Sequence, residues 1–232
     1  MWLASSCYRH LSRLRFWRGW LFEPLKNNEG LVGSKAMRRA LVVELVMGVC
    51  AGVSLSAACG FRVFLPLLAV SIAAHFFGFK VNADFEWIGS WISIVSLATA
   101  TIVEVAAYYL PCVDNLLDLV NVPLAFVAGA IVMSGVLPDV HPYLKWSIAG
   151  LFGSSAAGLT QLATTIIRGA STATTAGAGN NVVSSSDNVC ATVFSIGAIL
   201  IPLLAIVIVM IFLCVLGSRA KRLAAKVAKV AA

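Results

Sequence analysis

Two charged residues, Arg62 and Glu104, lie between or within long apolar stretches, and they are the first candidates for chemistry. An ionisable side chain inside a membrane costs at least ~2.5–3.5 kcal/mol on insertion scales, so it needs a partner or a polar cavity. One hypothesis is a buried pair between Arg62 and an acid that lines or gates a polar pathway. The alternative is that Arg62 and the acids lie near opposite interfaces, reach water and only anchor their helices.

Two further acids, Asp114 and Asp118, are four residues apart and follow Pro111. If this segment is helical, their side chains share one face. The same two interpretations apply to them: they belong to a polar pathway with Arg62, or they anchor a helix at the interface.

A third candidate region surrounds Gln161 and Arg168, where several threonines interrupt an otherwise apolar stretch. Residues 169–181 then contain only Gly, Ala, Ser, Thr and Asn. Such a segment forms either a re-entrant turn that offers backbone groups to an ion, or a flexible external loop. Asp187-Asn188, before the last apolar stretch, has the residue types of a helix N-cap.

The sequence contains no HExxH motif, no nucleophile elbow, no phosphate-binding glycine loop with a lysine, and no ligand set for haem. The six cysteines form no CxxC pair and show no Cys/His spacing typical of zinc sites. We therefore expect no metal, no cofactor and no enzymatic activity.

The elements that must position these residues are membrane helices. The chain is 60% hydrophobic and 12% charged, with a mean hydropathy of +0.93, whereas a soluble domain is about 25% charged. We predict an all-α polytopic fold with about six transmembrane helices, some of them short, broken or re-entrant. The expected crossings are approximately 40–59, 63–79, 87–110, 119–137, 146–167 and 189–216.

The first two expected crossings are near the lower length limit for a membrane span, and Pro66 interrupts the second. Two interpretations remain open. Transporters use such broken segments as discontinuous helices around a midplane site. Alternatively, these are two short helices joined by a tight turn.

Small residues recur every fourth position in the first and fifth crossings. Such faces let another helix approach closely, and we expect the two crossings to pack on each other through them. The positions are Gly48, Gly52, Ser56 and Gly60 in the first, and Gly150, Ser154 and Gly158 in the fifth.

Basic residues gather at the two ends of the chain. Residues 1–40 carry eight Lys/Arg, and 219–229 carry five with no acid. Basic flanks of membrane spans stay on the cytoplasmic side, so both termini are expected there, next to anionic lipid. This distribution does not indicate nucleic-acid binding. We divide the chain into a basic extension (1–39), a transmembrane domain (40–218) and a basic cytoplasmic tail (219–232).

Three interpretations fit the N-terminal extension. It is a basic amphipathic helix on the membrane surface, an arginine-rich transit peptide, or untranslated sequence upstream of a true start at Met37.

Several strings within 41–218 resemble a bacterial membrane-protein family catalogued as domain of unknown function 4126. The resemblance implies an integral protein of the bacterial inner membrane, and it brings no activity, substrate or cofactor. The strings are GFRVFLPLL (60–68), FEWIGSW (85–91), EVAAYYLPCVDNLLD (104–118), LPD (137–139), KW (145–146), AAGLTQLATTIIRGASTATTAGAGN (156–180) and DN (187–188).

Two functions are compatible with these features. The leading hypothesis is a small transporter or channel whose polar path uses Arg62, Glu104 and the segment after Arg168. The competing hypothesis is a scaffold or assembly partner of another membrane complex, or of a second copy of the chain. An intramembrane enzyme ranks third.

Overall fold

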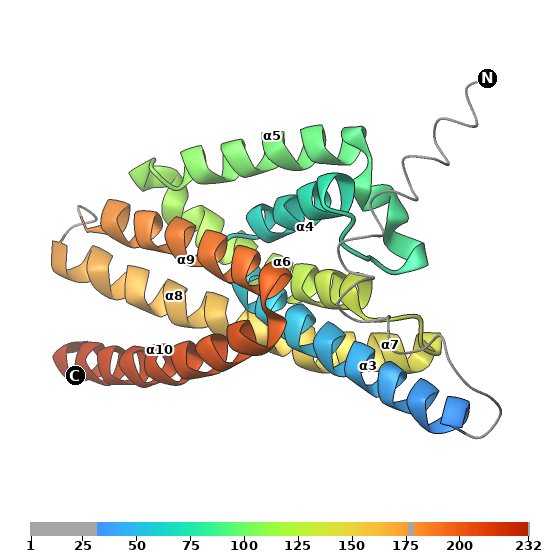
Figure 1. Cartoon of the computed structure of the whole chain (residues 1–232). Helices are drawn as coiled ribbons and strands as arrows, with labels where there is room; N and C mark the ends of the chain where they lie inside the picture. Colours follow the sequence, from blue (N-terminus) through green and yellow to red (C-terminus); the bar gives the residue numbers. More distant parts are fainter. Residues whose placement is uncertain (1–31, 176–178, 232) are drawn as a thin grey trace.

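The computed structural model describes residues 32–175 and 179–231, which fold as helices joined by short connections (Figure 1). The interpretations of the basic N-terminal extension fall mainly on residues 1–31, outside the described part. The α-helices are α3 (Val32–Cys59), α4 (Phe64–Phe76), α5 (Trp91–Ala107), α6 (Pro111–Val136), α7 (Pro142–Ile148), α8 (Ser154–Thr175), α9 (Asn180–Leu200) and α10 (Pro202–Ala231). A 3₁₀ helix η2 (Ala83–Gly89) precedes α5, and a π-helical turn η3 (Ala149–Gly153) joins α7 to α8.

Four described helical segments are long and apolar enough to cross a membrane, and a bent pair, η2 with α5, brings the number to five. The sequence predicts six. The second expected crossing is the 13-residue α4, and the fifth corresponds to α7, η3 and α8, where Gln161, Arg168 and several threonines lower the hydropathy. The four segments are Leu41–Cys59, Leu116–Val136, Asn180–Leu200 and Pro202–Arg219. The polytopic all-α fold is confirmed.

A first helical hairpin consists of α3 and α4, and its tip is the break at 60–62. Both arms return to the end of the bundle where α6 finishes. On the α3 arm, a Cβ at Gly48 would lie 3.0 Å from Pro138. Beyond α4, the Asn82 N–H donates to the Gly135 carbonyl at 2.7 Å. The hairpin therefore enters from one end and turns back inside the molecule.

A second hairpin, α9 and α10, enters from the opposite end, and its tip is Ile201-Pro202 (Figure 1). Pro202 has no N–H to continue the α9 ladder, so the helix ends and a new one begins. The single crossing expected at 189–216 is thus two helices. The N-cap expected at Asp187-Asn188 is also wrong, because α9 begins at Asn180 and both residues lie two turns inside it.

Because of the two hairpins, the first and last described helices begin and end at opposite ends of the bundle. In Figure 1, α3 begins at the lower right and α10 ends at the lower left. The expectation that both termini are cytoplasmic stays a prediction. Each hairpin turns back within the bundle, so the start of α3 and the end of α10 lie at opposite ends.

The small-residue faces meet α6 rather than chiefly each other, which corrects the expected pairing. On α3, the Ser56 hydroxyl donates to the Gly129 carbonyl at 2.8 Å, and a Cβ at Gly52 would lie 3.3 Å from Met133. On α8, the Ser154 hydroxyl donates to the Phe126 carbonyl at 2.8 Å, and a Cβ at Gly158 would lie 2.2 Å from the Phe126 ring. The prediction that these two faces pack on each other did not consider that α6 also carries small residues, such as Gly129.

Two glycines depart from that pattern. Gly60, at the hairpin tip, does meet α8, because a Cβ there would lie 2.4 Å from both the Ala157 carbonyl oxygen and Thr160 Cβ. At Gly150, no described residue lies within 4 Å of the position of an added Cβ, so none of them packs against that face.

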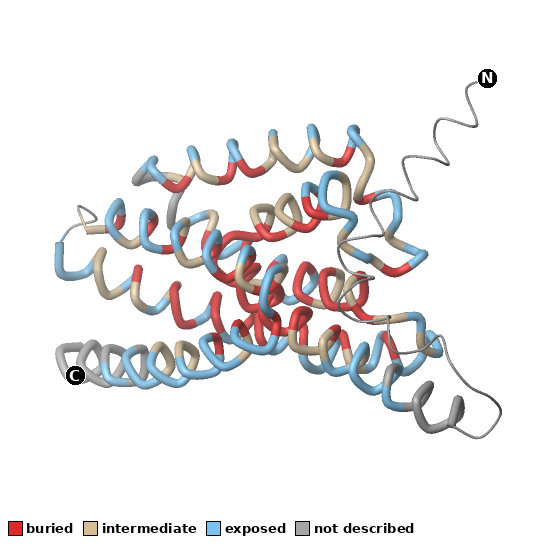
Figure 2. The backbone as a smooth tube through the Cα atoms, viewed as in Figure 1, coloured by how far each residue is buried: buried red, intermediate tan, exposed pale blue. Residues whose placement is uncertain are grey.

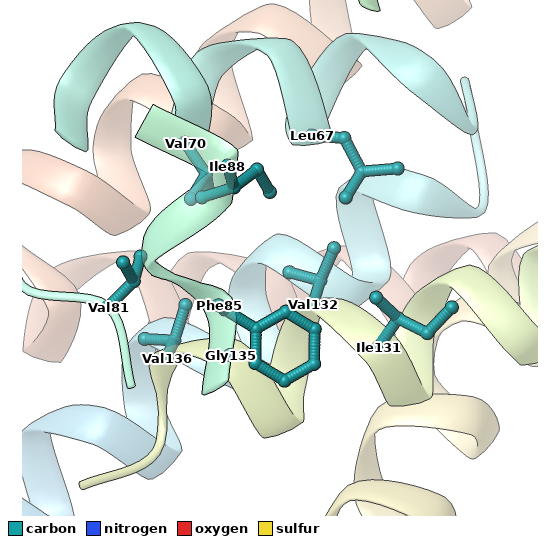
Figure 3. Close-up of a pocket in the computed structure, with 9 residues that line it drawn as sticks. All are labelled: Leu67, Val70, Val81, Phe85, Ile88, Ile131, Val132, Gly135 and Val136. Carbon is teal, nitrogen blue, oxygen red and sulfur yellow. The ribbon is translucent and has the colours of Figure 1, made fainter. Parts of the chain in front are cut away.

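Buried residues concentrate in the middle of the bundle (Figure 2), and many large apolar side chains are exposed on its outside. Ile92, Ile102 and Leu119 are examples, each more than two thirds exposed. Such a surface suits lipid rather than water. A cavity of about 10 Å³, lined only by apolar residues of α4, η2 and α6 and the segment between α4 and η2 (Figure 3), lies away from the charged side chains.

Candidate functional site

Polar side chains from five elements converge inside the bundle, at the tip of the first hairpin. We call this group the polar centre. All its members are buried except Asn188, which is half-buried. They are Arg62 at the break, Glu104 of α5 and Tyr108 just after it, Asp118 and Asn121 of α6, Arg168 of α8, and Ser184, Asp187 and Asn188 of α9.

Tyr108 is the hub of the polar centre. Its hydroxyl donates to Asp118 Oδ1 at 3.1 Å and accepts from Asn121 Nδ2 at 2.7 Å. The Cζ atoms of Arg62 and Arg168 lie 3.9 and 4.3 Å from the centroid of its ring. Two cation–π contacts thus fix both guanidinium groups against one aromatic ring, where desolvation strengthens them.

Arg168 is neutralised by carboxylates. It forms a hydrogen-bonded ion pair with Asp187 of α9, and its Nη1 lies 3.5 Å from Asp118 Oδ1 of α6. The side chains of all three residues are less than a tenth exposed. Charges this deep are tolerated only when they are paired, so this ion-pair group ties α8 to both α6 and α9.

Arg62 has a different environment. Its Nε donates to Asn188 Oδ1 at 2.6 Å, and its Nη2 donates to the Ser184 carbonyl at 3.1 Å. Both acceptors are neutral, and no carboxylate of the described residues lies within 4.0 Å of the guanidinium nitrogens. Arg62 Nη1 is buried, and it has no hydrogen-bond partner within the described part of the chain.

Glu104 binds backbone rather than Arg62. Its two carboxylate oxygens accept the N–H groups of Val63 and Phe64, at 2.9 and 3.1 Å. These are the first free donors of α4, so the carboxylate caps a helix whose own N-cap residue provides no side-chain cap. Arg62 and Glu104 stabilise the same break from different sides, and they form no direct ion pair.

A buried polar stripe runs along α8 from the contact with Gly60 to Arg168 of the polar centre. It consists of Thr160, Thr164 and Arg168, each four residues apart, with Gln161 beside them. The threonine hydroxyls donate to carbonyls of their own helix, as is common in membrane helices. Gln161 Nε2 lies 3.5 Å from the Thr165 hydroxyl, so Gln161 belongs to the stripe and not to the polar centre.

The α8 helix continues into the segment where a turn or loop was expected. Neither the re-entrant turn nor the external loop predicted over 169–181 matches the described residues. The α8 helix extends to Thr175, and α9 begins at Asn180, because Ala and Thr can prolong a helix that packs against a neighbour. Asn180 Nδ2 donates to the Thr172 hydroxyl at 2.8 Å across this junction. The Asp114 side chain lies outside the described residues.

The sequence analysis did not identify Tyr108 as part of the site, nor the residues that α9 contributes to it. Tyr108 has the residue type of an interfacial aromatic, although its i+4 spacing from Glu104 puts both on one face of α5. Asn121 lies one turn after Asp118, and that spacing was the available signal. Asp187 and Asn188 were recognised as polar residues before an apolar run, but they were given a capping role.

A third buried cation, after Arg62 and Arg168, lies at the end of the bundle where α6 finishes. Lys145 of α7 donates to Asn82 Oδ1 at 3.1 Å and forms an ion pair with Asp84 of η2. The Asp84 side chain is 69% exposed, so solvent shares this charge. We call this group the rim pair.

A family model described as "Domain of unknown function (DUF4126)" matches residues 49–222. The match spans every described residue of the polar centre. No curated protein and no solved structure matches the chain.

Proposed function

The chain belongs to the family described as Domain of unknown function (DUF4126), and from its polar centre we propose that it is a small transporter with an alternately accessible polar site in the membrane. The observation that carries the proposal is Arg62, a fully buried arginine at a helix break with one nitrogen left unpartnered. Ionisable groups inside a membrane are expensive, and they mark substrate and ion pathways.

The two hairpins provide a means of alternating access. They enter from opposite ends (Figure 1) and meet through aromatic rings. Phe61 at the first tip lies 5.7 Å from Phe194 of α9 and 5.5 Å from Phe212 of α10, measured between ring centroids. Transporters place broken helices around a central site and gate it by moving one bundle against the other. The α8 stripe provides the polar lining for such a path.

Purified full-length chain in liposomes, screened for ion and solute flux, tests the proposal. The variants Arg62→Ala and Glu104→Gln should lower flux at least about 10-fold, which corresponds to about 1.4 kcal/mol. The matched control is Lys145→Gln, which removes a buried cation from the rim pair and should leave flux unchanged. If wild type conducts and both polar-centre variants conduct equally well, the assignment of the path to these residues fails.

The membrane is proposed to be the bacterial inner membrane, with the α10 end of the bundle on the cytoplasmic side. The five basic residues of 219–229 support this orientation, because positive charge is retained in the cytoplasm and attracted to anionic lipid there. A C-terminal fusion that is fluorescent only in the cytoplasm, paired with one active only outside, tests it. Signal from the outside reporter alone would reverse the orientation.

A scaffold role is the second candidate, and α10 is the observation that favours it. Only 17% of the Pro202–Arg219 segment is buried, against 33–44% of the other three long apolar segments. Its apolar face is therefore available to a second membrane protein or to another copy of this chain. Absence of flux together with one stoichiometric partner in mild-detergent purification would support this function over transport.

A further inference from the structure

We propose that the polar centre binds a small oxyanion, a carboxylate or a phosphate group, and that Arg62 Nη1 is its principal donor. This inference names the solute class for the transport proposed above, and it rests on that function for its biological meaning. The juxtaposition that carries it is a fully buried guanidinium with two neutral acceptors, one aromatic ring and one unpartnered nitrogen.

The first step is the charge balance around Arg62. Burying an arginine without a counter-charge in contact is costly, and the nearest acids are engaged elsewhere. Asp187 is hydrogen-bonded to Arg168, Asp118 accepts from Tyr108 and lies beside Arg168, and Glu104 caps α4. Among the described residues, Arg62 is thus the cation of the polar centre with no carboxylate oxygen within 4.0 Å, and an oxyanion at Nη1 would supply one.

The second step is geometry. A guanidinium has five N–H donors in a rigid planar fork. Asn188 and Ser184 take one donor each from Nε and Nη2, and the Tyr108 ring lies 3.9 Å from Cζ. Both N–H groups of Nη1 stay available on a plane that is already fixed. Preorganised donors of this kind bind planar carboxylates and tetrahedral phosphates without first paying an ordering cost.

The third step excludes a cation as the ligand. Arg62 and Arg168 both lie against Tyr108, so a cation at Nη1 would meet two like charges, and Nη1 itself has no lone pair to offer. A neutral solute would offer Nη1 only an uncharged acceptor, which makes a weaker hydrogen bond than a charged one. An oxyanion gives the free donors of Nη1 the charge-assisted acceptors that they lack.

The fourth step concerns access. Nη1 is sealed from solvent in this structure, so the ligand can reach it only when a surrounding element moves. Arg62 lies on the tip of the first hairpin, and its two acceptors belong to α9 of the second. Separation of the first hairpin's tip from the first half of α9 would expose the donor, which links oxyanion entry to the hairpin motion of the proposed transport cycle.

Binding is tested on the purified full-length chain in nanodiscs of phosphatidylcholine, titrated with inorganic phosphate and with acetate in a calorimeter. We expect phosphate to bind wild type and the matched control Lys145→Gln equally. In Arg62→Gln the affinity should fall about 10- to 100-fold, the loss expected for a charge-assisted hydrogen bond. Arg62→Lys keeps the charge but loses the fork, so it should show an intermediate loss; it also serves if Arg62→Gln does not fold.

A second arm separates a free anion from a lipid headgroup. Here the nanodiscs contain anionic phosphatidylglycerol, and thermal unfolding is measured instead. If this lipid raises the melting temperature of wild type but not of Arg62→Gln while free phosphate does not bind, the oxyanion belongs to a lipid. If neither phosphate, acetate nor phosphatidylglycerol binds wild type, or if Arg62→Gln and Arg62→Lys bind like wild type, the inference is overturned.

The outcome is distinguishable from failure of the proposed function. Binding is measured here without flux, so a chain that binds phosphate but carries no solute contradicts transport alone. A chain that carries solute in liposomes but binds no oxyanion contradicts the present inference alone.

Discussion

The same helical run, α7 through η3 to α8, holds two buried cations in two different ways. Near one end, Lys145 pairs with Asp84, whose side chain is 69% exposed. Near the other end, Arg168 pairs with Asp187 and Asp118, which are less than a tenth exposed. Water shares the charge of the rim pair, whereas protein groups alone must balance the polar centre. Charge at the centre is therefore the more costly feature, and the one that needs a functional explanation.

The largest effect is expected when a carboxylate of the polar centre is replaced by an amide. Asp187→Asn removes the closest counter-charge of Arg168 and should lower the free energy of unfolding by about 3–5 kcal/mol, as expected for a broken buried ion pair. Titration with a denaturing detergent, starting from mild-detergent micelles, measures it. A loss below about 1 kcal/mol would show that Asp118 or water compensates Arg168, and the contrast with the rim pair would disappear.

A methyl group at the hairpin tip should have the next largest effect. Gly60→Ala places a Cβ 2.4 Å from the backbone oxygen of Ala157, so the tip must move away from α8. The cost should be about 3 kcal/mol, measured by the same titration. Gly150→Ala is the control: with nothing within 4 Å it should be neutral or up to about 1 kcal/mol more stable. Equal effects at the two glycines would argue against close contact at the tip.

Neutralisation of the α4 cap should cost less. In Glu104→Gln, the amide oxygen can accept one of the two N–H groups of Val63 and Phe64, but the amide NH2 group then lies against the other N–H. We expect the free energy of unfolding to fall by about 2 kcal/mol. Hydrogen exchange of these two amides should accelerate while exchange elsewhere in α4 changes little. Unchanged protection of both amides would mean that Glu104 does not cap the helix in the membrane.

The rim pair should respond least. Asp84→Asn makes the same chemical change as Asp187→Asn, yet Lys145 keeps Asn82 and has access to water near Asp84. The free energy of unfolding should fall by less than about 1 kcal/mol. A loss comparable to that of Asp187→Asn would erase the distinction between the two ends of the helical run.

The break at 60–62 shows how far sequence reasoning reached in the fold. Gly60-Phe61-Arg62 between two short apolar stretches, with Pro66 beyond, indicated either a discontinuous helix or two short helices joined by a tight turn. The structure has a hairpin tip there, which is closer to the second alternative. The second hairpin was missed, because Pro202 in a long apolar run is equally compatible with a kinked single span. The partner of the small-residue faces was also missed, since the sequence cannot say which of several small-residue helices lies between two others.

The polar centre shows the same division. Arg62, Glu104, Asp118 and Arg168 were identified because each is a charged residue in apolar surroundings. Their partners could not be predicted, because pairing depends on depth: Arg168 reaches α9, and Glu104 reaches the backbone of α4. Tyr108 was the hardest to find, because an aromatic residue at a helix end has the same sequence signature whether it faces lipid or the interior.

The amino-acid sequence alone determined that this chain is a bundle of apolar helices and that a few charged residues must be buried or anchored within it, because hydropathy and charge depend only on residue type. Tertiary structure alone decided that two hairpins meet inside the bundle, that Arg168 is paired with two carboxylates, and that Arg62 has no carboxylate of the described residues within 4.0 Å. Those facts depend on which helices are neighbours and at what depth each side chain lies, and both are set by packing between segments far apart in the chain.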